Sequence, residues 1–183
     1  NSVAAQSYRK LLQRGKHKII GFATREQGLI VRPGNPLGLH SLHDVVAKKA
    51  RFAQRSQGAG TRVLLAELMQ QEKLNFADLQ SPAADEPSHM AIAQAVASGA
   101  TDTGMAIRAA ADRLGLDFVH LAHENYWLVC LKSALESEPI THLRRFLETQ
   151  KWKKTLAQIS GYAPHESGKV QSLHRILPWW PAD

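Results

Sequence analysis

The chain has 183 residues, of which 44% are hydrophobic and 21% charged, so it can bury a core and does not have the composition of a disordered protein. Lys and Arg number 23 against 16 Asp and Glu, a formal net charge of +7, which favours oxyanions, organic acids, nucleic acid or anionic membranes as partners, or serves solubility alone. A single cysteine, Cys130, excludes a disulfide framework and a cysteine-based zinc site.

Short apolar runs alternate along the chain with amphipathic segments. In chain order we expect a helix at 7–13, strands at 17–23 and 28–31, a helix at 42–49, a strand at 51–54, a helix at 61–72, a helical turn at 75–79, a helix at 88–98, a strand at 101–106, a helix at 107–114, strands at 117–121 and 126–131, and helices at 142–149 and 151–159. The tail after Gly161 is expected to be irregular. Strands that alternate with helices predict an α/β fold with a mostly parallel sheet.

The most informative segment is the glycine-containing stretch 55–62, Arg-Ser-Gln-Gly-Ala-Gly-Thr-Arg, between an expected strand and a strong helix. Its glycines permit a tight turn, and the unpaired amides and dipole at the start of the helix favour an anion. A plain strand-to-helix turn is the alternative. The nucleotide-binding glycine patterns are absent, so a nucleotide is not the preferred ligand. The candidate ligand-binding residues here are Arg55, Ser56, Gly58, Ala59, Gly60 and Thr61.

A second helix start, at Ser88 and His89, offers another set of free amides and a hydroxyl. Two helix starts that face one gap would hold an oxyanion, although an ordinary N-cap explains Ser88 equally well. Glu124 and Tyr126, on a later strand, are interpreted either as the lining of a cleft or as packing at a hinge.

Other chemistry is weakly marked. His40 with His43 and His120 with His123 have a spacing that suits metal binding on a helix, but no third ligand accompanies them, so we expect no metal site. Cys130 lies in an apolar run, where a thiol usually behaves as a buried hydrophobe. No nucleophile elbow is present, and we expect no catalysis. The Pro-Trp-Trp-Pro sequence at 178–181 is interpreted as a docked tail.

Several motifs resemble a family of periplasmic-binding-protein-like domains that are often labelled molybdate-binding or substrate-binding domains. They are 25–36 (Arg-Glu-Gln-Gly-Leu-Ile-Val-x-Pro-Gly-Asn-Pro), the turn 55–62, and the segments 88–99, 102–107, 115–119 and 124–126; the resemblance fades near 161 and 168. Arg25 and Tyr126 lie in these segments and complete the candidate ligand-binding set. Two departures are Ala59, where the family commonly has serine, and Ala106, where it often has glycine.

The resemblance implies a two-lobed architecture of the second periplasmic-binding-protein class. We expect a first lobe at 1–35 plus 121–175, with the crossing strands, incomplete at its N-terminus, a second lobe at 36–120, and a tail at 176–183. A bare sheet edge left by the incomplete lobe would be covered by a homodimer.

The predicted function is non-catalytic binding or sensing of an oxyanion such as molybdate or tungstate, transmitted by closure of the lobes. The alternative is a ligand-free regulatory or protein-interaction module of the same fold. Relatives imply a fused or separate partner that is a helix-turn-helix DNA-binding domain or a molybdenum-cofactor synthesis domain. We expect no cofactor, no nucleic-acid contact by this chain and no membrane span, and a location in the cytoplasm, or in the periplasm if a signal peptide precedes Asn1.

Overall fold

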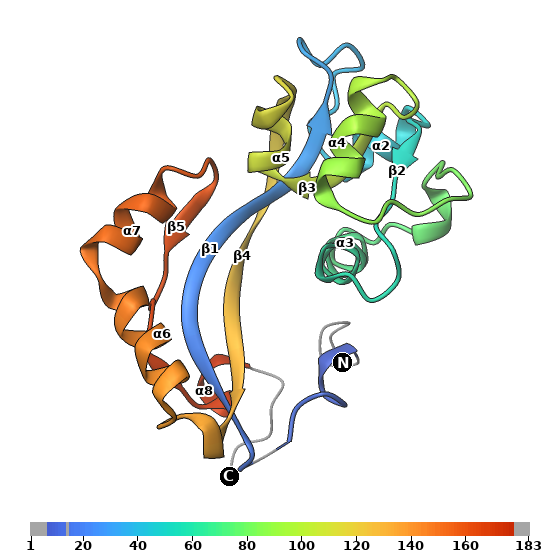
Figure 1. The fold of residues 1–183 in the computed structure, drawn as a ribbon. Coiled ribbons are helices and arrows are strands. Elements are labelled where there is room, and N and C mark those ends of the chain that lie inside the picture. The colour runs from blue at the N-terminus through green and yellow to red at the C-terminus, as the bar shows by residue number, and fades with distance from the viewer. Residues whose placement is uncertain (1–6, 14, 178–183) are drawn as a thin grey trace. The chain divides into compact units, whose positions relative to one another are not determined.

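The computed structural model describes residues 7–13 and 15–177 (Figure 1). The chain divides into two compact units, a central unit at Glu26–His123 and a terminal unit formed by Asn1–Arg25 and Glu124–Asp183. Two long strands, β1 (His17–Val31) and β4 (Asp117–Leu131), each contribute residues to both units.

The central unit contains most of the short elements. They are α2 (Leu42–Ala47), β2 (Phe52–Ala53), α3 (Gly60–Gln71), the 3₁₀ helix η1 (Phe76–Asp78), α4 (His89–Ala97), β3 (Thr103–Ile107) and α5 (Arg108–Arg113). The strand order is β2-β3-β1-β4. β2 runs parallel to β3, whereas β1 runs antiparallel to β3, with Gly28 opposite Ala106.

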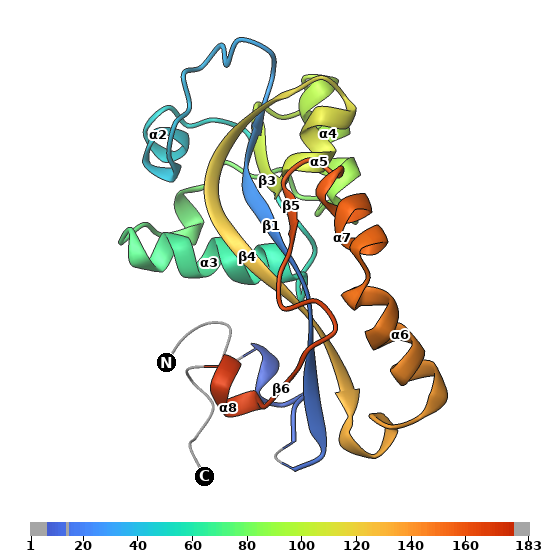
Figure 2. The same cartoon turned by 90° about the vertical axis from the view of Figure 1, so that its left-hand side faces the viewer.

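Alternating residues of these strands build two cores, one on each face of the sheet. Leu29, Phe52 and Met105 point into a core with α2 and α3, whereas their neighbours Ile30, Ala53 and Ala106 point into a core with α4 and α5. Figure 2 shows α2 and α3 on one side of β1 and β3, and α4 and α5 on the other. Both faces are covered, so the strands are apolar on both sides.

One glycine in the central unit lets two strands approach closely. A Cβ placed on Gly28 of β1 would lie 2.1 Å from the carbonyl oxygen of Val119 on β4 and 2.8 Å from the Phe118 ring. Only a residue without a side chain fits there.

The terminal unit surrounds the other halves of β1 and β4. It adds the 3₁₀ helix η2 (Lys132–Ala134), α6 (Glu138–Glu148), α7 (Gln150–Ala157), β5 (Tyr162–Pro164), β6 (Val170–Gln171) and α8 (Leu173–Ile176). β5 and β6 pair antiparallel with β1, through Ala23 opposite Pro164 and Ile19 opposite Gln171. Phe22 of β1 contacts Tyr126 and Trp152 with ring centroids 5.3 and 5.5 Å apart.

The outer edge of β4 is unpaired within the part of the chain that the structure describes, because β1 is its one strand neighbour there. In the terminal unit this strand exposes apolar side chains, with Val129 50% and Leu131 51% exposed. A long apolar edge of this kind is a template for pairing with another strand.

The structure corrects several sequence-based expectations. The sheet is mostly antiparallel, because β1 and β4 are long strands that run in opposite directions. The amide of Lys132, just after the end of β4, donates to the carbonyl of Lys16, just before the start of β1. The amide of Gly34, after the end of β1, donates to the carboxylate of Asp117 at the start of β4. β1 and β4 were each predicted as two short strands. The polar run Thr24–Gln27 stays extended because its residues pair with β5 and β3.

The ends of the chain also differ from expectation. Only Ser7 and Tyr8 of the predicted first helix are helical, and the segment after Gly161 forms β5, β6 and α8 rather than an irregular tail. Cys130 is half-buried rather than buried, and burial raises the pKa of its thiol. The Pro-Trp-Trp-Pro sequence lies outside the described residues.

The positive charge of the chain is divided unequally. The terminal unit holds 14 Lys and Arg against 6 Asp and Glu, whereas the central unit holds 9 against 10. The surplus therefore belongs to the terminal unit, and the central unit is close to neutral. No helix among the described residues is both long enough and apolar enough to cross a bilayer.

Candidate functional site

The structure brings the two predicted helix starts together within the central unit. Arg55, the first residue of the turn 55–62, forms a parallel β-bridge with Glu86, which lies two residues before the α4 cap. The amide of Glu86 donates to Gln54 at 2.7 Å, and its carbonyl accepts from the amide of Ser56 at 3.3 Å. The starts of α3 and α4 are thus held by neighbouring backbone segments.

Several donors at the start of α3 are available to a ligand. Ala59 is the N-cap of α3 and supplies no side-chain cap. No acceptor among the described residues contacts the amides of Gly58, Gly60 or Thr61, nor does one contact the Thr61 hydroxyl, although Thr61 is only 3% exposed. Gly58 has φ +82°, and a Cβ there would meet no atom within 4 Å, so this side of the turn is open. Such a cluster of neutral donors suits an anion.

Ser88 is the N-cap of α4, as predicted. Its hydroxyl oxygen accepts from the Ala91 amide at 3.0 Å, which stabilises the first turn. The serine therefore orders the helix start, and His89 begins the helix directly after it.

The two arginines of the turn have protein partners. Arg55 donates from Nε to the Glu86 carbonyl at 3.2 Å and from Nη2 to the Pro87 carbonyl at 3.0 Å. Arg62 donates from Nη1 to the Arg55 carbonyl at 2.8 Å and to the Asp85 carboxylate at 2.9 Å. These contacts could not be predicted from the sequence, because an arginine beside a glycine turn is suited to binding a ligand as well as to binding protein carbonyls.

Arg25 and Tyr126 lie in the terminal unit, where Arg25 forms an ion pair. Its Nε donates to Glu124 at 2.5 Å, and its guanidinium carbon lies 4.6 Å from the Tyr126 ring centroid. Burial acts to lower the pKa of Arg25, but the hydrogen bond and charge of Glu124, with Tyr162, outweigh it and raise that pKa. Arg25 is therefore a fixed cation stacked on an aromatic ring.

A second charged cluster lies in the central unit around Glu26. This carboxylate accepts from Arg108 Nε at 2.7 Å and lies 3.4 Å from His120 Nδ1, and the rings of His120 and His123 are 4.5 Å apart. Burial acts to raise the pKa of Glu26, but Arg108 and then His120 outweigh it and lower that pKa. Residues 7–13 and 15–177 contain no group of three or more His, Cys, Asp or Glu side chains placed to hold a metal.

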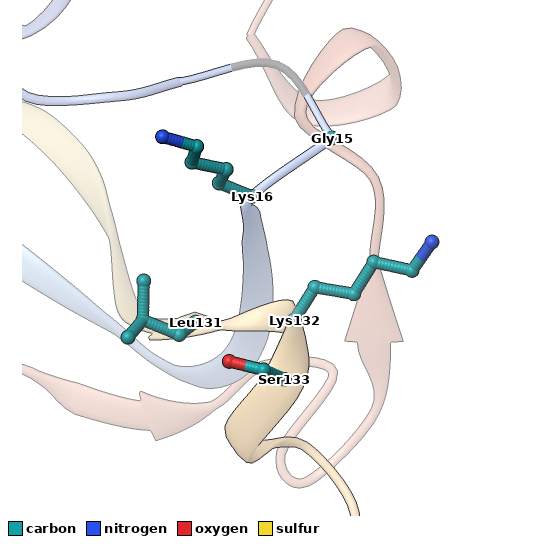
Figure 3. A pocket seen from close by; sticks show the side chains of 5 residues that line it. All are labelled: Gly15, Lys16, Leu131, Lys132 and Ser133. Carbon is teal, nitrogen blue, oxygen red and sulfur yellow. The ribbon is translucent and has the colours of Figure 1, made fainter.

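A pocket of about 620 Å³ lies in the terminal unit, where β1 begins and β4 ends. It is lined by Gly15, Lys16, Leu131, Lys132 and Ser133, and contains none of the predicted site residues. Figure 3 shows the two lysine side chains extending in opposite directions. Their ammonium groups do not converge, so the pocket does not form a two-lysine anion site.

Comparison with known proteins finds a sequence relative, structural neighbours and a family for this chain. A relative, the uncharacterized protein YvgK of Bacillus subtilis (strain 168), is 31% identical over 152 residues, 83% of this chain and 49% of the relative. The chain therefore spans about half the length of that curated protein.

Solved structures show the same fold at low sequence identity. The substrate-binding domain of a protein assigned as a molybdenum ABC transporter from Clostridium difficile matches 88% of this chain and 75% of its own, with a TM-score of 0.61 and 14% identity. The regulatory domain of CcmR from Synechocystis PCC6803, in complex with 2-PG, matches 74% and 67%, with a TM-score of 0.59 and 16% identity. These neighbours are small-ligand-binding domains, one of them regulatory.

A family model described as the PBP superfamily domain matches residues 1–148, well over half of the chain. The predicted fold class, α/β of the two-lobed periplasmic-binding-protein type, is confirmed by this match and by the structural neighbours. The chain belongs to the family of PBP superfamily domains.

Proposed function

We propose that the chain is a non-catalytic domain that binds a small oxyanion, such as molybdate or tungstate, at the starts of α3 and α4. The observation that carries the proposal is the cluster of backbone amides at Gly58, Gly60 and Thr61, which have no acceptor among the described residues, with the Thr61 hydroxyl beside them. The neighbouring start of α4, capped by Ser88, adds a second helix dipole.

The structural neighbours support an anion as the ligand class. One is a complex with L-phospholactate and another is an effector-binding domain in complex with shikimate, and both ligands are organic anions. The molybdenum transporter domain supports an inorganic oxyanion. We choose molybdate or tungstate over a phosphate that carries a proton, because residues 55–62 contain no carboxylate that could accept that proton. A phosphate that carries a proton would need such an acceptor.

The regulatory neighbours support a sensing role. We propose that an attached DNA-binding or molybdenum-cofactor synthesis domain responds to the bound anion. The closure of two lobes on the ligand, expected from the sequence resemblance, stays a prediction.

Replacing Thr61 with valine tests the site directly. Valine keeps the volume of the side chain but removes the hydroxyl donor, so we expect the affinity for molybdate or tungstate to fall about tenfold, the equivalent of one lost hydrogen bond. Isothermal titration calorimetry of the 183-residue chain with molybdate, tungstate and sulfate measures the change. The matched control is Thr101→Val, a threonine of the same unit that is 2% exposed and lies outside the turn. If Thr61→Val and Thr101→Val both bind the anion as tightly as the wild-type chain does, Thr61 is not part of the site.

The second candidate function is a ligand-free interaction module, and the exposed edge of β4 favours it. The occupant we propose is a second copy of this chain, paired antiparallel along the outer edge of β4, because a copy offers the same open strand with the same exposed side chains of Val129 and Leu131. The double variant Val129→Lys, Leu131→Lys puts charge on this edge, and we expect it to convert a dimer into a monomer in analytical ultracentrifugation. Leu143→Lys on α6 is the control, because Leu143 is also exposed. A wild-type chain that is monomeric at high concentration would contradict the module.

A further inference from the structure

Arg55 and Arg62 connect the turn before α3 to the segment before α4. Arg55 reaches the carbonyls of Glu86 and Pro87 from two separate guanidinium nitrogens. Arg62 donates to both the Asp85 carboxylate and the Arg55 carbonyl from a single guanidinium nitrogen, Nη1. All these acceptors lie within three residues before Ser88 or in the turn itself, so the contacts fix the backbone that leads into α4.

The position of Arg62 is unfavourable unless its charge is balanced. It lies in the first turn of α3, where the helix dipole disfavours a cation. Asp85 balances that charge, and the Arg62 side chain is only 23% exposed. The pair therefore has a structural role before any anion arrives, because a lone cation there would destabilise the helix.

We propose that Arg55 and Arg62, with their acceptors on residues 85–87, form an arginine clasp that positions the start of α4 against the start of α3. The ligand part of this inference rests on the proposed function. Neither arginine serves as the counter-charge of the anion. The clasp instead sets the spacing of the two helix starts, so the anion receives its hydrogen bonds from amides and hydroxyls.

Replacing Arg55 with lysine separates the effect of its hydrogen-bond geometry from the effect of its charge. Lysine keeps the positive charge but donates from a single nitrogen. It therefore cannot reproduce the two hydrogen bonds that the planar guanidinium makes from two nitrogens. If Arg55 acted as a counter-charge, Arg55→Lys would keep most of the affinity for the anion. Because it acts through position, we expect Arg55→Lys to weaken molybdate binding about tenfold while the charge is unchanged.

The control is Arg51→Lys, on the residue that directly precedes β2. Arg51 is also bound in a fork, to Asp102 and the Ala100 carbonyl, but it does not contact the segment before α4. Calorimetry with molybdate and sulfate should show the loss in Arg55→Lys and none in Arg51→Lys. Wild-type affinity in Arg55→Lys would overturn the clasp.

Hydrogen exchange gives a readout that needs no ligand. The amides of Ala91 and Ile92 donate to the hydroxyl and carbonyl of Ser88, so they report the order of the first turn of α4. We expect them to exchange at least about threefold faster in Arg55→Lys than in Arg51→Lys. If the wild-type chain binds none of the anions, the proposed function fails, and exchange alone decides the clasp: faster exchange supports it and unchanged exchange overturns it.

Discussion

Replacing Ala59 with aspartate is expected to stabilise the chain and at the same time to abolish anion binding. Alanine is a poor N-cap, and Ala59 supplies no side-chain cap to α3. An aspartate there would accept from the free amides of the first turn and lie favourably at the positive end of the helix dipole, for a gain of about 1 kcal/mol. The same carboxylate would repel an oxyanion and occupy its donors, so the affinity should fall at least about a hundredfold.

Two measurements on each variant separate these effects. Urea unfolding gives the change in stability, and calorimetry with molybdate or tungstate gives the change in affinity. Ala59→Ser is the control, because serine caps the helix without adding a charge, so its affinity should fall far less than that of Ala59→Asp. An Ala59→Asp variant that is more stable but binds the anion as the wild type does would place the ligand away from this turn.

The largest loss of stability is expected from Gly28→Ala. The added methyl group would lie 2.1 Å from the carbonyl oxygen of Val119, a backbone atom near the start of β4. Neither strand can move without disturbing the two cores on the faces of the sheet, so we expect a cost of about 3 kcal/mol or more in the free energy of unfolding.

Gly58→Ala is the comparison for this second variant. Gly58 has φ +82° and open space around its missing side chain, so its substitution costs only the strained backbone conformation, about 1 kcal/mol. Chemical denaturation of both variants, followed by circular dichroism, measures the difference. Equal costs would mean that β1 and β4 separate easily at Gly28.

The sequence predicted elements well where local signals are strong. The start of α4 at Ser88 and the helix after the glycine turn were placed within one residue, because a capping hydroxyl and an amphipathic period act locally. The direction of the strands was predicted wrongly. Residues Thr24–Gln27 read as a polar interruption, and only pairing with strands far along the chain keeps β1 continuous.

The candidate site was predictable in its backbone and not in its side chains. Glycines followed by a helix indicate free amides from sequence alone. The partners of Arg55 and Arg62 depend on residues 85–87, which reach the turn through tertiary structure. The ion pair of Arg25 with Glu124 likewise joins residues 99 positions apart, so no local pattern marks it.

The unequal division of charge has a consequence for how ionic strength acts on the chain. An anion held by neutral amides in a unit with 9 basic and 10 acidic residues gains little from long-range attraction, so its affinity should change only slightly with added salt. Polyanions that associate with the terminal unit would instead release counterions, and their binding should weaken steeply as salt rises. A salt titration therefore separates a specific ligand of the helix starts from diffuse attraction to the basic half of the molecule.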